Sequence, residues 1–168
     1  MKIEIGAGTK GMEGYVHVDA VALEGVDVVD DGRTLATFAS DVAEEIYCHW
    51  FLEHVAKHEV PAMFDAWKRV LRSGGKIKLI TNNHAAHNRC LQEGEISWDE
   101  WEYLIYAVRT KVNYNVWDVH KSAWNPEVLQ SVLEGNGFVD VTVKAGWQCR
   151  EVDGRLKCPA LTAEAFKP

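Results

Sequence analysis

The chain has 168 residues, a formal net charge of −7, 47% hydrophobic residues and 26% charged residues. This composition is typical of a globular protein, and the length fits one domain, so we expect a single domain over 1–168. No apolar run approaches the ~20 residues that span a bilayer, which excludes a membrane segment, and the acidic balance argues against a nucleic-acid partner.

The first half of the chain combines short apolar runs with one helical repeat. Strands are predicted over 2–5, 15–18, 26–29 and 45–48, because each short run ends at Gly, Asp or His. Apolar residues at 60, 63, 64, 67, 70 and 71 predict an amphipathic helix over 59–72, which Ser73-Gly74-Gly75 would end. An alternating strand over 76–80 follows, so the order is typical of a mostly parallel α/β sheet.

The second half begins with an insertion at about 82–124 that is rich in His, Trp, Tyr and Asn. It contains a predicted helix over 98–109, and we expect most of its aromatic side chains to pack in the core. A second helix is predicted over 126–136, with Asn125 as its cap and Pro126 at its first position. A strand over 138–143 and a strand pair within 146–167, turning near Asp153-Gly154, complete the chain.

Two features of the sequence bear on the compartment. The chain begins directly in a predicted strand, without the basic and apolar segments of a signal peptide. Its four cysteines are widely spaced and form no C-x-x-C pair. We therefore expect reduced thiols and a cytoplasmic protein.

The most informative motif lies at the first two predicted strands, where Gly6-Ala7-Gly8 follows one strand and Asp19 ends the next. Glycines directly after a strand let the backbone approach a ligand, and an acid at the tip of the next strand can accept both ribose hydroxyls. Six residues, 9–14, join the two runs, which predicts a short first crossover without a full helix. A pyrophosphate would lose its usual helix N-terminus, which favours another adenosine-type ligand over a dinucleotide.

As a set, the motifs resemble those of a small class I S-adenosylmethionine-dependent methyltransferase. The resemblance covers about 3–143, and its motifs lie at 5–8, 14–19, 25–29, 49–54, 67–75, 118–120 and 137–138. It implies a Rossmann-like, mostly parallel seven-stranded sheet with flanking helices and an antiparallel last strand. It also implies a compact subgroup without an N-terminal lid helix, so any lid would come from 82–124. S-adenosyl-L-methionine would be the methyl donor and a small molecule the acceptor, in a monomer or homodimer.

The resemblance assigns roles around the first two strands. Gly6, Ala7 and Gly8 would form the loop under the methionine part of the cofactor. Glu4 occupies a position where the family often has an acid that orients the cofactor's amino group. Asp19 would hold the ribose hydroxyls, in agreement with its place at the strand tip.

Further assignments fall after the third and fourth strands. Asp31, with the backbone near Gly32, would face the adenine, and His49 would lie near the sulfonium. Gly32 departs from the pattern, because a larger apolar residue usually packs on the adenine there. We therefore expect that contact to be looser in this chain.

Histidines supply the candidate catalytic bases, namely His49, His84, His87 and His120. A hydroxyl acceptor needs a base within hydrogen-bond reach, and histidine suits this role because its unperturbed pKa is about 6.5. His84 and His87 follow a strand, so they either face the mouth of the pocket or lie in a solvated loop. Asp118 and His120 are either a base with its orienting carboxylate or a structural hydrogen bond.

His54 and His58 stand four residues apart, which is a spacing that zinc ligands on one helical face can have. No third ligand is evident from the sequence, and the H-E-x-x-H arrangement is absent. Packing or a surface position is the simpler interpretation of the pair. We therefore expect no metal.

The leading hypothesis is an enzyme that transfers a methyl group to a small hydroxyl or amine acceptor. One alternative is a non-catalytic protein or partner subunit that binds S-adenosylmethionine or S-adenosylhomocysteine. A third candidate is an NAD-dependent oxidoreductase, which the short first crossover disfavours. Binding of the sulfonium cofactor and formation of a methylated product separate these three.

Overall fold

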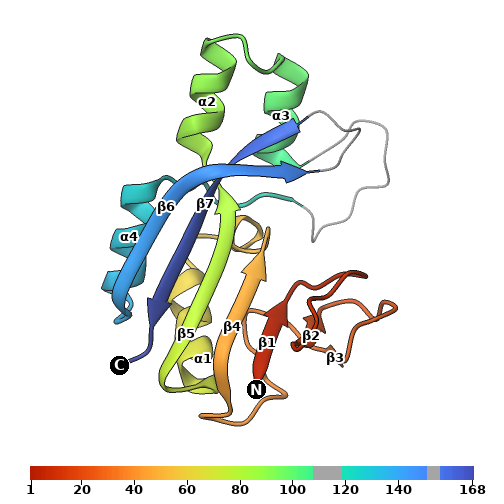
Figure 1. Cartoon of the computed structure of the whole chain (residues 1–168), viewed down its shortest axis with the longest axis vertical. Coiled ribbons are helices and arrows are strands. Elements are labelled where there is room, and N and C mark those ends of the chain that lie inside the picture. Colours follow the sequence, from red (N-terminus) through yellow and green to blue (C-terminus); the bar gives the residue numbers. More distant parts are fainter. Residues whose placement is uncertain (108–118, 151–155) are drawn as a thin grey trace.

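The computed structural model describes residues 1–107, 119–150 and 156–168, and its centre is a seven-stranded sheet of order β3-β2-β1-β4-β5-β7-β6 (Figure 1). Strand β7 is antiparallel to both neighbours, whereas the pairs formed among β1 to β5 are parallel. The strands are β1 (Lys2–Ile5), β2 (Val16–Asp19), β3 (Val28–Val29), β4 (Ala43–His49), β5 (Leu71–Asn82), β6 (Val139–Arg150) and β7 (Leu156–Phe166). The predicted fold class is confirmed, including the antiparallel last strand.

The first crossover is short, as predicted. Strands β1 and β2 lie side by side with Ile3 opposite Val16, and the connection between them contains no helix. The Met12 backbone closes this connection, because its N–H donates to Glu4 Oε2 at 2.6 Å and its carbonyl lies 2.8 Å from His17 Nε2. One side chain from each strand therefore stabilises this connection, which contains no helix.

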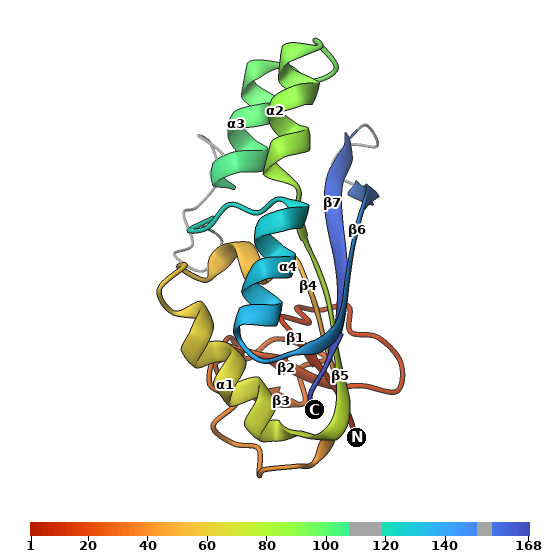
Figure 2. The same ribbon diagram turned by 90° about the vertical axis from the view of Figure 1, so that its left-hand side faces the viewer.

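Two helices, α1 (Val60–Val70) and α4 (Pro126–Gly135), cover one face of the sheet (Figure 2). Both were predicted, and the Asn125 side chain caps α4 by accepting the Val128 N–H at 2.8 Å. The expected end of α1 at 73–75 is wrong. The helix ends at Val70 because Leu71 already has extended backbone, and the two glycines lie within β5.

A second helix pair, α2 (His84–Gln92) and α3 (Trp98–Tyr106), extends beyond the carboxyl ends of the central strands (Figure 1). Helix α3 begins at a reciprocal cap between Ser97 and Glu100 and ends with Ala107 in the left-handed region. Helix α2 was not predicted, because two histidines occupy its buried face and hide its apolar period.

The aromatic side chains of the insertion differ in burial. Trp124 is 1% exposed and belongs to the main core, as expected. Trp98 is 59% exposed, Tyr106 is 50% exposed, and Trp101 and Tyr103 are half-buried, so the expectation that most of these side chains pack in the core is wrong for the described residues. These four lie on α3, where only Leu104 is buried, and Tyr114 and Trp117 lie outside the described residues. The insertion therefore presents an aromatic surface to solvent.

The carboxyl-terminal strands form one long antiparallel pair. The prediction separated a strand over 138–143 from the later strand pair, but β6 is one continuous strand from Val139 to Arg150. Its register against β7 shifts between Val139 and Thr142. Its partner β7 returns between β6 and β5.

Within the described parts of the chain, no helix is both long enough and apolar enough to cross a membrane.

Candidate cofactor-binding site

A cavity of about 370 Å³ lies at the carboxyl ends of β1, β2, β3 and β4. Its size is typical of small-molecule sites, and this end of a parallel sheet is where α/β proteins bind ligands. The residues that line it are Ile5, Gly6, Gly8, Asp19, Ala20, Val21, Leu23, Asp31, Gly32, Arg33, Trp50, Phe51, His54, Val55 and Lys121.

The glycine turn and the acid at the end of β2 meet in this cavity. The Gly8 N–H donates to Asp19 Oδ2 at 3.1 Å, and the Val21 N–H donates to Oδ1 at 3.0 Å. Gly6 and Gly8 have φ angles of +69° and +57°, which favour glycine at both positions. Each carboxylate oxygen can accept more than one hydrogen bond, so Asp19 keeps capacity for two ribose hydroxyls. Ala7 lies between the glycines but is not on the cavity wall.

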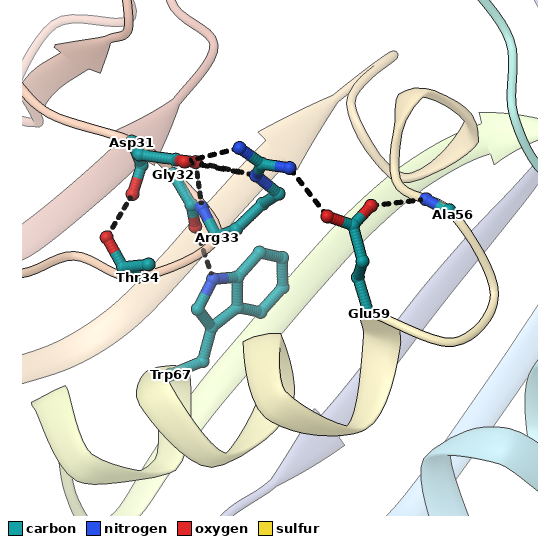
Figure 3. Close-up of polar contacts among 7 residues, drawn as sticks. All are labelled: Asp31, Gly32, Arg33, Thr34, Ala56, Glu59 and Trp67. Atoms are coloured by element: carbon teal, nitrogen blue, oxygen red, sulfur yellow. Dashed lines mark hydrogen bonds and ion pairs between the residues drawn. The ribbon is translucent and has the colours of Figure 1, made fainter.

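Asp31 also faces the cavity, but its carboxylate is hydrogen-bonded to Arg33 (Figure 3). Both oxygens accept hydrogen bonds from Arg33, the shortest being 2.6 Å from Nη2 to Oδ2. These bonds lower the pKa of Asp31, so the carboxylate stays ionised. Arg33 Nη1 also bonds to Glu59 Oε1 at 2.7 Å, just before α1. Through its bonds to Asp31 and Glu59, Arg33 thereby joins the cavity wall to the start of that helix.

The backbone of Gly32 is held by a tryptophan of α1 (Figure 3). The buried Trp67 Nε1–H donates to the Gly32 carbonyl at 2.8 Å. A Cβ atom at position 32 would overlap the Ile5 side chain and press on the Phe51 ring. Because Phe51 lies on the cavity wall, its ring supplies an apolar surface beside Gly32, where a larger residue was expected.

Gly32→Ala should destabilise the protein by about 1–3 kcal/mol, because the added methyl group has no room beside Ile5 and Phe51. It should also weaken binding of S-adenosylhomocysteine, since relief of the overlap moves the cavity wall. Urea unfolding and calorimetric titration measure the two effects. Gly135→Ala is the control, because nothing lies within 4 Å of a Cβ there. A Gly32→Ala variant as stable as Gly135→Ala would contradict the prediction.

Besides Ala7, two further residues expected at the cofactor lie off the cavity wall. Glu4 is buried, and its carboxylate accepts the Met12 N–H, so the structure gives it a role in closing the first crossover. His49 stacks on Trp50 with ring centroids 5.1 Å apart, and only Trp50 of the two lines the cavity. Trp50 has a φ of +56°, which is uncommon for a bulky residue and is compatible with a constrained functional position.

His84 and His87 lie on the buried face of α2, with 8% and 0% of their surface exposed. The expectation that they face the pocket mouth or a solvated loop is wrong, because the segment is a helix packed against the protein. The Trp124 N–H donates to His84 Nδ1 at 3.2 Å, which joins α2 to the segment before α4. Burial lowers the pKa of each imidazole to about 4, so both are neutral near pH 7.

Buried His87 makes the fold sensitive to acid. Its pKa is about 4 in the folded state and about 6.5 when unfolded, so the unfolded chain binds the extra proton as the pH falls. Stability present above pH 6.5 is therefore lost below it, by about 2 kcal/mol for this group between pH 7 and pH 5. In urea unfolding, the loss of stability between pH 7 and pH 5 should be smaller by that amount in His87→Leu than in the wild type. Exposed His58 offers the control His58→Leu, and an equal difference in all three proteins would contradict this prediction.

His120 is half-buried beside the cavity, and its predicted partner Asp118 lies outside the described residues. The His120 ring lies 4.9 Å from that of His54, which lines the cavity. Burial, followed by repulsion from the His54 and His84 rings when they are protonated, lowers the pKa of His120 to about 3. A general base works best with a pKa near the working pH, so His120 is a weak base in this environment.

Several wall residues were not predicted. Trp50, Phe51, His54 and Val55 follow β4 directly, so their position after a strand was a usable signal. Lys121 reaches the cavity from a distant part of the chain, where its backbone N–H donates to the Glu53 carbonyl at 2.7 Å. No local pattern indicates that contact.

Comparison with known proteins finds similarity in structure only. No protein-family model and no curated protein matches the chain. A SAM-dependent methyltransferase from Methanosarcina mazei matches with a TM-score of 0.68 at 14% identity, over 99% of this chain and 91% of the other. One from Archaeoglobus fulgidus matches with a TM-score of 0.64 at 15% identity, over 99% and 85%. Phosphoethanolamine N-methyltransferase 2 of Haemonchus contortus, in complex with S-adenosyl-L-methionine, matches with 0.61 at 14%, over 99% and 48%.

Proposed function

We propose that this chain, which has the class I methyltransferase fold, binds S-adenosyl-L-methionine and transfers its methyl group to a small-molecule hydroxyl or amine. The observation that carries the proposal is the contact between Gly8 and Asp19, 3.1 Å long, on the wall of one cavity. The turn leaves room for the methionine part, and Asp19 accepts from the ribose hydroxyls. The wall formed by Gly32 and Phe51 receives the adenine.

Methyl transfer from a sulfonium is an in-line displacement on an already activated donor. The protein therefore contributes mainly alignment of the acceptor and exclusion of water. Trp50, Phe51 and Val55 form an apolar wall after β4 that suits the exclusion of water. His54 and Lys121 are polar wall residues outside the proposed nucleoside contacts, so they are suited to orient the acceptor.

Thermal unfolding with added ligands tests the binding step. S-adenosylmethionine and S-adenosylhomocysteine, each at ~100 times its dissociation constant, should each stabilise the fold by ~2.7 kcal/mol. NAD is the comparison ligand and should have no effect, because the first crossover offers no helix N-terminus for a pyrophosphate. Stabilisation by NAD alone would instead support an oxidoreductase.

A non-catalytic binding protein is the second candidate, and the weak basicity of His120 favours keeping it. The two candidates differ in product formation. Incubation with methyl-labelled S-adenosylmethionine and a panel of small alcohols and amines should yield a labelled acceptor if the protein is an enzyme. Cofactor binding with no labelled product across the panel would favour the binding protein.

A further inference from the structure

Glu53, His54 and His120 form a cluster of metal-ligating side chains at the edge of the cavity. One potential ligand atom from each lies within 4.8 Å of the others. Glu53 and His54 belong to the 3-10 helix η1 (Leu52–His54), whereas His120 comes from the far side of the insertion. The N–H groups of Lys121 and Ser122 donate to the Glu53 carbonyl at 2.7 and 3.1 Å, which holds the two segments together.

Backbone carbonyls fix the orientation of both imidazoles. His54 Nδ1 lies 3.2 Å from the Val119 carbonyl, and His120 Nδ1 lies 3.1 and 3.2 Å from those of Leu104 and Ile105. A carbonyl can only accept, so in each neutral ring Nδ1 carries the hydrogen and Nε2 carries the lone pair. Proteins orient metal-binding histidines in this way, through a hydrogen bond from the other ring nitrogen.

Hydrogen bonds also fix the orientation of the Glu53 side chain. It is 0% exposed, and its two oxygens accept from Thr81 Oγ1 at 2.9 Å and Asn82 Nδ2 at 3.2 Å. Both donors are neutral groups that fix the direction of the carboxylate. Carboxylates that bind metals are commonly oriented by hydrogen bonds of this kind.

We propose that Glu53, His54 and His120 bind one divalent transition-metal ion. Two imidazoles and one carboxylate suit Zn²⁺ and its first-row neighbours, whereas Mg²⁺ prefers oxygen ligands alone. At bond lengths of about 2.1 Å, the ligand atoms of a tetrahedral ion are about 3.4 Å apart, so the cluster needs a small contraction. This revises the expectation of no metal, which considered His54 with His58. His58 is exposed and precedes α1, so the two do not share a helical face.

The proposed ion would also narrow the acceptor class, an inference that rests on the proposed function. Three protein ligands would leave one coordination position for an acceptor oxygen, and His54 lies on the cavity wall that the acceptor would enter. A coordinated hydroxyl loses its proton to solvent more readily than a free one. Its oxygen then bonds to the methyl carbon as the carbon–sulfur bond breaks, and the sulfonium leaves as a neutral thioether. The site therefore favours oxygen over nitrogen acceptors.

Calorimetric titration of the EDTA-treated, dialysed full chain with ZnCl₂ tests the site. We expect one zinc ion per chain, at least tenfold weaker binding in His54→Ala and in His120→Ala, and wild-type binding in His58→Ala. Circular dichroism checks that each variant is folded, and His120→Gln replaces His120→Ala if that variant unfolds. Cobalt(II) should give a visible absorption band that the His120 variant lacks. Absence of stoichiometric zinc binding, or equal binding in the His54, His120 and His58 variants, would overturn the proposal.

A parallel titration with S-adenosylhomocysteine separates this inference from the proposed function. It is performed on the metal-free protein in EDTA, where the nucleoside contacts do not require the ion. Nucleoside binding without zinc binding overturns the metal site and leaves the proposed function standing. Zinc binding without nucleoside binding supports the metal site and contradicts the proposed function.

Discussion

Asp19→Ala should abolish the stabilisation of the fold by S-adenosylhomocysteine. Hydrogen bonds to a charged group contribute about 1.5–3 kcal/mol each, so losing both ribose contacts should weaken binding by about 3 kcal/mol or more, over 100-fold. The substitution also removes the acceptor of the Gly8 N–H, which loosens the turn under the methionine part. Calorimetric titration of the variant measures the loss directly.

Asp65→Asn is the matched control for this experiment. It also removes one negative charge, but Asp65 is exposed on α1 and lies off the cavity wall. Its affinity for S-adenosylhomocysteine should equal that of the wild type. If Asp19→Ala binds as tightly as Asp65→Asn, Asp19 does not hold the ribose.

Trp67→Ala should destabilise the protein by about 3–5 kcal/mol, because it leaves a large cavity between α1 and the sheet. Trp67 is 0% exposed and packs edge-on against Phe64, with ring centroids 5.5 Å apart. Its Nε1–H also satisfies the Gly32 carbonyl, so the variant should bind S-adenosylhomocysteine more weakly. Urea unfolding and a ligand titration measure both changes.

Trp98→Ala serves as the reference for tryptophan removal, since Trp98 is 59% exposed on α3. Its effect on the free energy of unfolding should stay near 0.5 kcal/mol or less, as for other surface substitutions. Trp67→Phe separates packing from hydrogen bonding, because it keeps a ring but leaves the Gly32 carbonyl without its donor. Equal destabilisation by Trp67→Ala and Trp98→Ala would show that the packing beneath the cavity is not as described.

The parts of the fold that depend on local pattern were predictable. The six residues between Gly8 and Tyr15 are too few for a crossover helix, and the structure has none there. The period of apolar residues in α1 identified that helix, although its end was misplaced. Helix α2 escaped prediction because His84 and His87 count as polar in any pattern, while the folded chain buries both.

The candidate site was predictable where its groups lie at the ends of adjacent strands. Gly6 and Gly8 follow β1, Asp19 ends β2, and the structure brings all three to one cavity. Whether they hold the cofactor stays a prediction. Contacts between distant segments left no sequence signal, as with the approach of His120 to His54.

The glycine at position 32 shows the same limit of prediction from local sequence. The sequence indicated only that a large side chain was missing at this position. The folded chain brings Phe51 to the cavity wall from beyond β4 and ties the Gly32 carbonyl to Trp67 on α1. Two segments form this part of the wall and a third holds it in place, and because the three are far apart in sequence, local pattern alone could not predict the arrangement.

A crystal structure of the protein with S-adenosylhomocysteine would show whether the glycine turn and Asp19 hold the nucleoside. We expect the two ribose hydroxyls within hydrogen-bond distance of the Asp19 carboxylate, the amino-acid end over the Gly6–Gly8 turn and the adenine beside Phe51. Density for the ligand at any other place on the chain, or a ribose turned away from Asp19, would contradict it.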